Sequence, residues 1–193
     1  MTKKEEKRKK IIDTSLKLFI KSGFHGTPTS LIAKEAGIAT GTLFNYFKTK
    51  DILINEIFKS IKIEQVTNIL NGITSEKSKK KQLKKVWNNM IIWGLENPEK
   101  RKFLEYFDNS YYITEDTLKT LERHYKKILM LFNEIGKRKK MNKEESLMAL
   151  FNFVGACIYT EKYFEATETK YSNELSNQAF ERFCIGLNLI DED

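Results

Sequence analysis

The chain is poor in the residues that interrupt helices and in those that build metal or disulfide frameworks. Its 193 residues include two prolines, nine glycines, two cysteines and two histidines. So few turn-forming residues disfavour an architecture of many short strands, and a strongly helical protein is expected. Cys157 and Cys184 stand in apolar stretches without a CxxC motif, so buried reduced thiols are expected. We expect no metal site and no cofactor.

Long apolar runs are lacking as well. The most apolar stretch, residues 147–159, contains Asn152 and is too short to cross ~30 Å of hydrocarbon. The apolar residues after the basic N-terminus are interrupted by Asp13 and Lys17, unlike those of a secretory signal. A cytoplasmic protein is therefore expected. No HExxH, GxSxG or P-loop motif occurs, so an enzyme is not expected.

Positive charge is concentrated at the start of the chain. The formal net charge is +8. Residues 1–50 hold eleven Lys or Arg against four Asp or Glu, whereas the other 143 residues hold twenty-three against twenty-two. The first quarter is therefore expected to meet a polyanion. Charge alone leaves both nucleic acid and an anionic membrane surface open.

Apolar residues recur at helical spacing along the whole chain, which predicts about nine helices. Three segments come first, of which the second and third are short: 5–22, ending at Gly23; about ten residues between the cap Thr27-Pro28 and Gly37; and 40 to 46 or 47, capped by Thr40. Six further segments follow, with Thr49, Asn97 and Asn142 as expected caps: 50–71, 77–96, 98–110, 114–137, 143–168 and 172–190.

The second and third predicted helices form a helix-turn-helix, because both are short and a glycine-bearing turn separates them. A helix that enters the major groove, ~12 Å wide, needs an anchored apolar side and small or polar residues facing outward. Leu43 and Phe47 supply the anchor. Thr42 and Asn45 can reach base edges, and Gly41 allows the backbone to approach phosphate. On spacing alone, two short packed helices without a DNA role remain an alternative.

The sequence of this region resembles the signature of the TetR (tetracycline-repressor-like) family without a gap. The matching run, residues 23–51, reads GFHGTPTSLIAKEAGIATGTLFNYFKTKD. It contains the motifs IAxxAG, G-T-L-aromatic and F-x-x-K in the family's order and spacing. The resemblance implies an all-α transcriptional regulator, with a helix-turn-helix DNA-binding domain at 1–50 and an effector-binding and dimerisation domain at 51–193. It also implies repression, by default, at a palindromic double-stranded DNA operator.

Three positions depart from the family's usual pattern, and each loses a polar group: Ala39, Thr40 and Phe44. Phe44 is therefore expected to pack, and Thr40 to cap its helix. Affinity for DNA is then expected to depend more on Lys48, Lys50 and the arm Lys3–Lys10. The residues predicted to contact DNA are Thr29, Thr40, Gly41, Thr42, Asn45, Tyr46, Lys48 and Lys50.

The resemblance further implies a homodimer that forms through the last two helices. Two apolar stripes are compatible with this interface or with a simple core. They are Leu147, Leu150, Phe151, Val154 and Ile158 on one helix, and Phe180, Phe183, Cys184, Leu187 and Ile190 on the other.

An effector pocket is expected among the aromatic residues between Trp87 and Tyr163. Ligand sites are mostly apolar with a few converging polar groups, and His124 lies beside an apolar stripe. For any single aromatic residue, core packing is the more common role. The nominated residues are Trp87, Ile91, Phe107, Tyr111, His124, Phe151 and Tyr159, and the expected effector is small and hydrophobic, aromatic or cationic. A regulator without an effector, or a basic protein on a membrane surface, remains an alternative.

Overall fold

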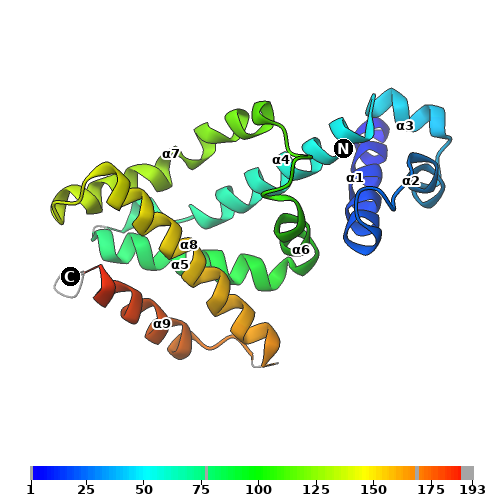
Figure 1. The fold of residues 1–193 in the computed structure, drawn as a ribbon. Helices are drawn as coiled ribbons and strands as arrows, with labels where there is room; N and C mark the ends of the chain where they lie inside the picture. Colours follow the sequence, from blue (N-terminus) through cyan, green and yellow to red (C-terminus); the bar gives the residue numbers. More distant parts are fainter. Residues whose placement is uncertain (1, 77, 168–169, 188–193) are drawn as a thin grey trace. The chain divides into compact units, whose positions relative to one another are not determined.

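The computed structural model describes the chain except for residues 1, 77, 168–169 and 188–193. The described residues contain helices and no strand, as predicted (Figure 1). Their nine α-helices and one 3-10 helix are α1 (Lys3–Ser22), α2 (Thr29–Ala36), α3 (Thr40–Tyr46), α4 (Lys50–Ile69), η1 (Ile73–Ser75), α5 (Lys79–Glu96), α6 (Pro98–Phe107), α7 (Glu115–Arg138), α8 (Lys143–Ala166) and α9 (Asn173–Gly186).

The chain folds as two compact units, each built from two stretches of sequence. The first unit contains the residues up to Ile63 together with Asn97–Leu121, and so holds α1, α2, α3 and α6. The second contains Glu64–Glu96 and the residues from Glu122 onward, and so holds α5, α8 and α9. Helices α4 and α7 each contribute to both units. The predicted functional boundary after residue 50 is a different division and stays a prediction.

Several helix ends are made by the residues that the sequence nominates. The Asn142 side chain accepts a hydrogen bond from the Glu145 amide, and the Glu145 carboxylate accepts one from the Asn142 amide. Thr49 Oγ1 accepts a bond from the Ile52 amide at the start of α4. Gly23 ends α1 with a φ of 68°, a conformation that glycine adopts without steric cost.

Two predicted caps are wrong. Thr27 does not cap α2; its buried hydroxyl donates to Gly23 O (2.7 Å), with Leu18 O 3.2 Å away, because the tight turn after α1 brings these carbonyls within reach. The N-cap of α2 is Pro28 instead. Thr40 is the first residue of α3, and Ala39 stands at the N-cap without a side-chain bond. Three predicted positions, Lys77, residue 168 and Ile190, lie outside the described residues.

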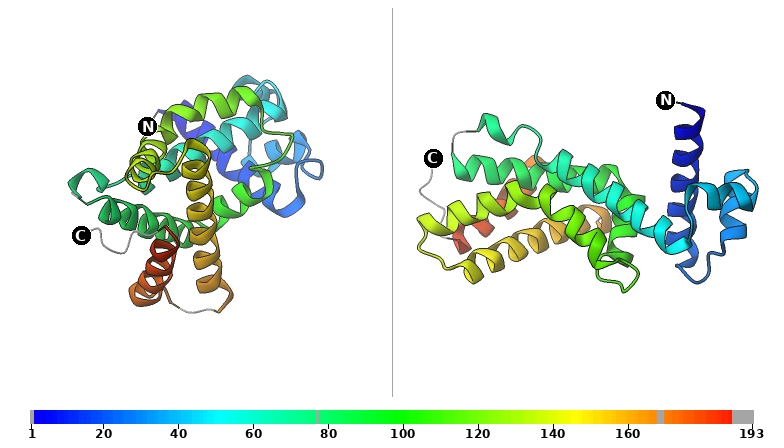
Figure 2. Two further views of the ribbon diagram at one scale, coloured as in Figure 1. Left: turned by 60° about the vertical axis from the view of Figure 1, so that its left-hand side comes forward. Right: turned by 90° about the horizontal axis from the view of Figure 1, so that it is seen from above.

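The second unit has a core built around Trp87 of α5. Its indole Nε1 donates to Ser176 Oγ on α9 at 3.1 Å, which satisfies the one polar atom of the buried ring. The ring contacts Phe153 of α8 and Phe180 of α9 edge to face, with centroids 5.6 and 5.7 Å apart. These contacts join three helices, and Figure 2 shows α8 and α9 side by side.

Both cysteines lie in this same core and are free, as predicted. Burial raises the pKa of Cys157 well above its ordinary value and raises the pKa of Cys184 to about 11. Neither thiol is therefore a thiolate near neutral pH, and both act as small apolar groups.

Candidate nucleic-acid interface

Helix α3 has one buried side and one open side, as a reading helix requires. Leu43 is 1 % exposed and Phe47, which follows the helix, is 3 % exposed, so both anchor it to the first unit. Of the residues predicted to contact DNA, four are exposed, namely Thr40, Gly41, Asn45 and Lys48, and four are half-buried, namely Thr29, Thr42, Tyr46 and Lys50. The structure brings the α3 members together on one short helix; their contacts with DNA stay predictions.

Phe44 lies on the open side of α3, contrary to the expectation that it packs. Its side chain is 39 % exposed; successive side chains of an α-helix are about 100° apart, so Phe44 is turned out of the direction of the inward-facing Leu43. An apolar ring on this face can contact a thymine methyl group, whereas it cannot bind phosphate. The exposure of Phe44 was not predicted, because the expectation rested only on the hydroxyl that phenylalanine lacks.

The start of α3, rather than the turn before it, is open to a close approach from outside. Gly37 ends α2 in the left-handed region with a φ of 66°, and the Lys10 ammonium lies 3.3 Å from where a Cβ at Gly37 would stand. Nothing lies within 4 Å of the corresponding position at Gly41. The basic N-terminal helix thus brings a cation to the turn, and the backbone at the start of α3 is uncovered.

Two basic residues of the predicted phosphate-binding group have partners inside the first unit. Lys50 Nζ donates to Phe24 O (2.8 Å) and Thr27 O (3.2 Å), and lies 4.1 Å from the centre of the Phe24 ring. Burial lowers the pKa of Lys50, and the charge of Asp51 opposes this shift. Arg8 donates to Glu56 of α4 at 2.7 Å and lies 5.2 Å from the Phe47 ring. Sequence alone does not reveal these contacts.

The connection between α6 and α7, residues 108–114, adds two functional candidates that the sequence analysis missed, Tyr112 and its neighbour His25, beside the nominated Tyr111. Tyr112 stacks on Phe24 with ring centroids 4.2 Å apart, and His25 Nε2 lies 3.2 Å from the Tyr111 hydroxyl. The Tyr111 and Tyr112 hydroxyls are hydrogen-bonded at 2.7 Å, and this bond, which favours the protonated form of Tyr112, raises its pKa to about 12. The available signal was Asn55, a polar residue within the mostly apolar segment 52–58 of α4.

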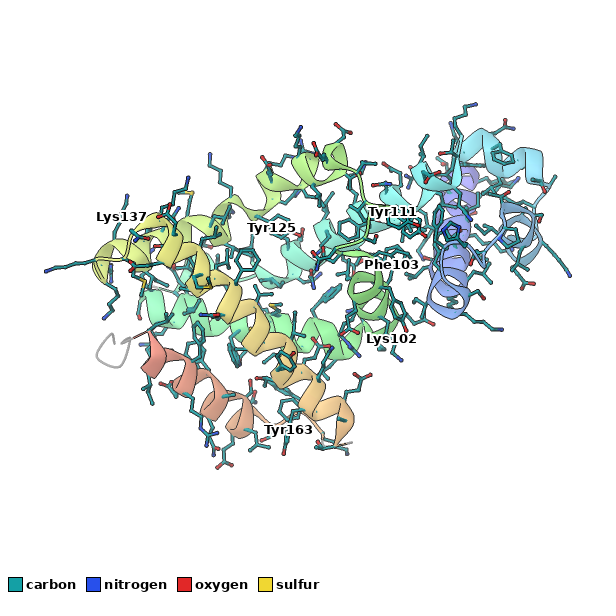
Figure 3. The ribbon with its side chains drawn as sticks, in the orientation of Figure 1. Lys102, Phe103, Tyr111, Tyr125, Lys137 and Tyr163 are labelled. Atoms are coloured by element: carbon teal, nitrogen blue, oxygen red, sulfur yellow. The ribbon has the colours of Figure 1, made fainter. Side chains whose placement is uncertain are left out.

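The residues nominated for an effector pocket are distributed over both units. Phe107 and Tyr111 belong to the first unit, where Phe107 is buried and Tyr111 is 81 % exposed. Trp87 and Ile91 are fully buried in the second unit. The group also includes His124, which is half-buried beside Arg123, and the exposed residues Phe151 and Tyr159. Trp87 and Ile91 share one core; the pocket as a whole stays a prediction. Figure 3 shows Tyr111 in the α6–α7 connection.

Helix α8 presents a second apolar side in addition to the one in the core. Met148, Phe151 and Tyr159 are 61 %, 67 % and 76 % exposed and follow one another at helical spacing. Gly155 stands between the two aromatic residues, with no atom within 4 Å of a Cβ placed there. Exposed apolar side chains aligned along one side of a helix mark a candidate contact surface.

Within the part of the chain that the structure describes, no helix is long and apolar enough to cross a membrane. In that same part, no three His, Cys, Asp or Glu side chains are grouped so that they could hold a metal ion.

The comparisons with known proteins agree with this geometry. Residues 11–57 match the family described as "Bacterial regulatory proteins, tetR family". The "Fatty acid metabolism regulator protein" of Bacillus subtilis (strain 168) is 39% identical over 59 residues, which are 31% of this chain and 30% of that protein. The chain likewise spans only 31% and 43% of the next two curated relatives.

Solved structures resemble the chain over nearly its whole length. A Shewanella sp. PV-4 protein assigned to the tetR family of transcription regulators has a TM-score of 0.81 and 27% identity, covering 92% of this chain and 95% of that one. The transcriptional regulator FadR from Bacillus subtilis, solved in complex with stearoyl-CoA, has a TM-score of 0.68 and 20% identity, covering 90% and 96%. This second likeness concerns the fold.

The anchored short helix, its open outer side and the basic helix beside it define a helix-turn-helix protein. Together with the matching signature, they place residues 11–57 in the tetR family of bacterial regulatory proteins, and the chain as a whole has the fold of a solved tetR-family transcription regulator.

Proposed function

We propose that this chain binds a palindromic DNA operator as a homodimer and represses transcription until a small hydrophobic effector releases it. Residues 1–50 would read DNA, and residues 51–193 would bind the effector and form the dimer. The main support is the outward side of α3, where Gly41, Phe44 and Asn45 are exposed on a helix anchored by Leu43. The net charge of +7 in residues 1–50 supports the same assignment.

The experiment is a selection of bound sequences from a random duplex DNA pool, followed by affinity measurements over a range of salt concentrations. Asn45→Ala should cost on the order of 1–3 kcal/mol at particular base pairs. Lys48→Ala should instead weaken binding to all sequences and reduce the salt slope by about one, because one counterion release is lost. The exposed Lys102 of α6 provides the matched control, and Lys102→Ala should leave the slope unchanged.

Three results would contradict the proposal. Selection could yield no preferred sequence, Asn45→Ala could weaken specific and non-specific DNA equally, or the protein could sediment with anionic liposomes and ignore DNA. The last result would favour the membrane-surface alternative.

The proposed dimer forms through α8 and α9 of two copies. The exposed stripe Met148, Phe151 and Tyr159 supplies the apolar area that the core of such an interface needs. Gly155 allows a partner helix to approach the α8 backbone closely between the two aromatic side chains. A symmetric dimer presents two copies of α3, which fits a two-fold symmetric operator with half-sites about one helical turn apart.

The proposed effector is a small hydrophobic molecule, and long-chain acyl compounds are its first candidates. The FadR structure contains stearoyl-CoA, and a curated relative regulates fatty acid metabolism. We keep the seven nominated pocket residues as candidates. An effector can release DNA only if it favours a state in which the two α3 helices no longer match successive grooves.

The effector is tested by following Trp fluorescence and operator release together while fatty acids, acyl-CoAs and aromatic cations are added. A ligand of the proposed kind changes both signals at the same concentration. Quenching without DNA release would contradict the coupling, and unchanged ligand affinity in His124→Ala would remove His124 from the pocket.

A further inference from the structure

The α6–α7 connection is fixed to α4 by one buried amide. Asn55 of α4 is 9 % exposed, and its Nδ2 donates to Asp51 O and to Tyr112 O, both at 2.8 Å. Its Oδ1 accepts from the Thr114 amide at 3.0 Å and from Thr117 Oγ1 at 2.8 Å. Both donors and the acceptor of the amide are therefore used. Asn55 thus holds the connection and the first turn of α7 at a set place on α4.

The same connection holds the turn between α1 and α2 through Phe24. The Phe24 ring is packed between three groups: Phe19 of α1, with centroids 5.9 Å apart; Tyr112, at 4.2 Å; and the Lys50 ammonium, at 4.1 Å. Lys50 also binds the Phe24 and Thr27 carbonyls. Since α2 begins at Thr29, these contacts determine the direction in which the chain enters the helix-turn-helix.

The turn has little freedom to adjust on its own. A Cβ at Gly26 would stand 2.2 Å from Ser22 O, so the backbone here is tightly folded onto the end of α1. The Thr27 hydroxyl is bonded to Gly23 O inside the turn. A shift of Phe24 would therefore move the turn as a body and carry α2 with it.

We propose that Tyr112 and Asn55 are positioning residues of the DNA-reading unit: they set the direction of α2 and α3 through Phe24 without touching DNA. Tyr112 lies three residues before the start of α7, so a displacement at the beginning of α7 reaches the turn before the helix-turn-helix through the stacked Phe24–Tyr112 pair and the neighbouring contacts of His25. The proposal rests on the proposed function where it concerns operator binding. Its structural part does not need DNA.

The first measurement is amide hydrogen exchange of residues 23–37 in the full chain without DNA. Tyr112→Ala removes the stacked ring and should speed exchange of this segment by about 3–10-fold, as expected for one lost aromatic contact. Asn55→Ala should act in the same direction. Tyr112→Phe keeps the ring and should exchange like the original protein. Tyr106→Ala, which removes an aromatic that is 63 % exposed on α6, is the matched control and should have no effect.

The second measurement is affinity for the selected operator as a function of salt. Tyr112→Ala should lower affinity about tenfold at an unchanged salt slope, because no phosphate contact is lost. A reduced slope would mean that Tyr112 acts at the DNA, and would overturn the proposal. Unchanged exchange at residues 23–37 would overturn it too, and so would faster exchange spread over both units, which indicates general destabilisation. If no DNA is selected at all, the proposed function fails while the exchange measurement still decides this inference.

Discussion

Lys140 adopts a backbone conformation that its side chain disfavours. Its φ is 57°, in the left-handed region, and the turn after α7 is closed by a bond from the Met141 amide to Gly136 O at 2.8 Å. Glycine is the residue that such a helix end prefers. We therefore expect Lys140→Gly to raise the free energy of unfolding by about 1 kcal/mol.

The matched control is Lys137→Gly, which removes the same charge from within α7, where glycine costs about 1 kcal/mol. Urea unfolding followed by circular dichroism measures both. If Lys140→Gly and Lys137→Gly shifted the urea midpoint of unfolding in the same direction, this account of Lys140 would be contradicted.

Single residues also mark how far the sequence alone could predict the candidate site. The exposed positions of α3 follow from helical spacing, because Leu43 and Phe47 fix which side is buried. The partners of Lys50 and Arg8 could not be predicted, since both depend on contacts between segments far apart in the chain. Phe44 was wrongly expected to pack because its lost hydroxyl, rather than its position on the helix, was considered.

At the scale of helices, the sequence predicts which helices exist and in what order they follow. It predicts the residues at which they begin and end less accurately. Capping by Asn142 could be predicted, because the residues of a capping box are three apart. Thr27 could not be placed, since its hydroxyl binds the end of the preceding helix rather than the start of the next. The division into two units that each use two separate stretches of chain is set by packing of distant helices, and periodicity carries no information on it.

The contact between α5 and α9 gives a prediction at this scale. Trp87→Leu leaves a cavity among Phe153 and Phe180 and frees the Ser176 hydroxyl, so it should destabilise the protein by about 3 kcal/mol. Ser176→Ala leaves the buried indole N–H without an acceptor and should cost about 1–3 kcal/mol.

Because the two residues share one bond, the double variant should cost less than the sum of the single ones. Chemical unfolding of all three variants measures this. Strict additivity would show that the bond contributes nothing to stability.

At the scale of the whole molecule, charge and apolar surface separate along the chain. The net positive charge lies in the first fifty residues, whereas the exposed apolar stripe lies on α8. A protein that reads a symmetric operator needs positive charge to bind DNA and an apolar surface to form a dimer. The dimer is needed because a single seven-residue helix covers few base pairs and pairing two copies doubles the contact.

The last prediction concerns this pairing and uses α8. Phe151→Glu places a charge at the centre of the proposed interface and should raise the dimer dissociation constant by about 100-fold or more.

Gly155→Ala is the sharper variant. Within one subunit it meets open space and should stabilise α8 by about 1 kcal/mol, whereas in the dimer the added methyl group stands where the partner helix passes. A more stable subunit with weaker association is therefore expected, as measured by thermal unfolding and analytical ultracentrifugation. Met130→Glu, at a residue that is 50 % exposed on α7, is the control for added surface charge. Association that survives Phe151→Glu and Gly155→Ala unchanged would place the dimer contact elsewhere.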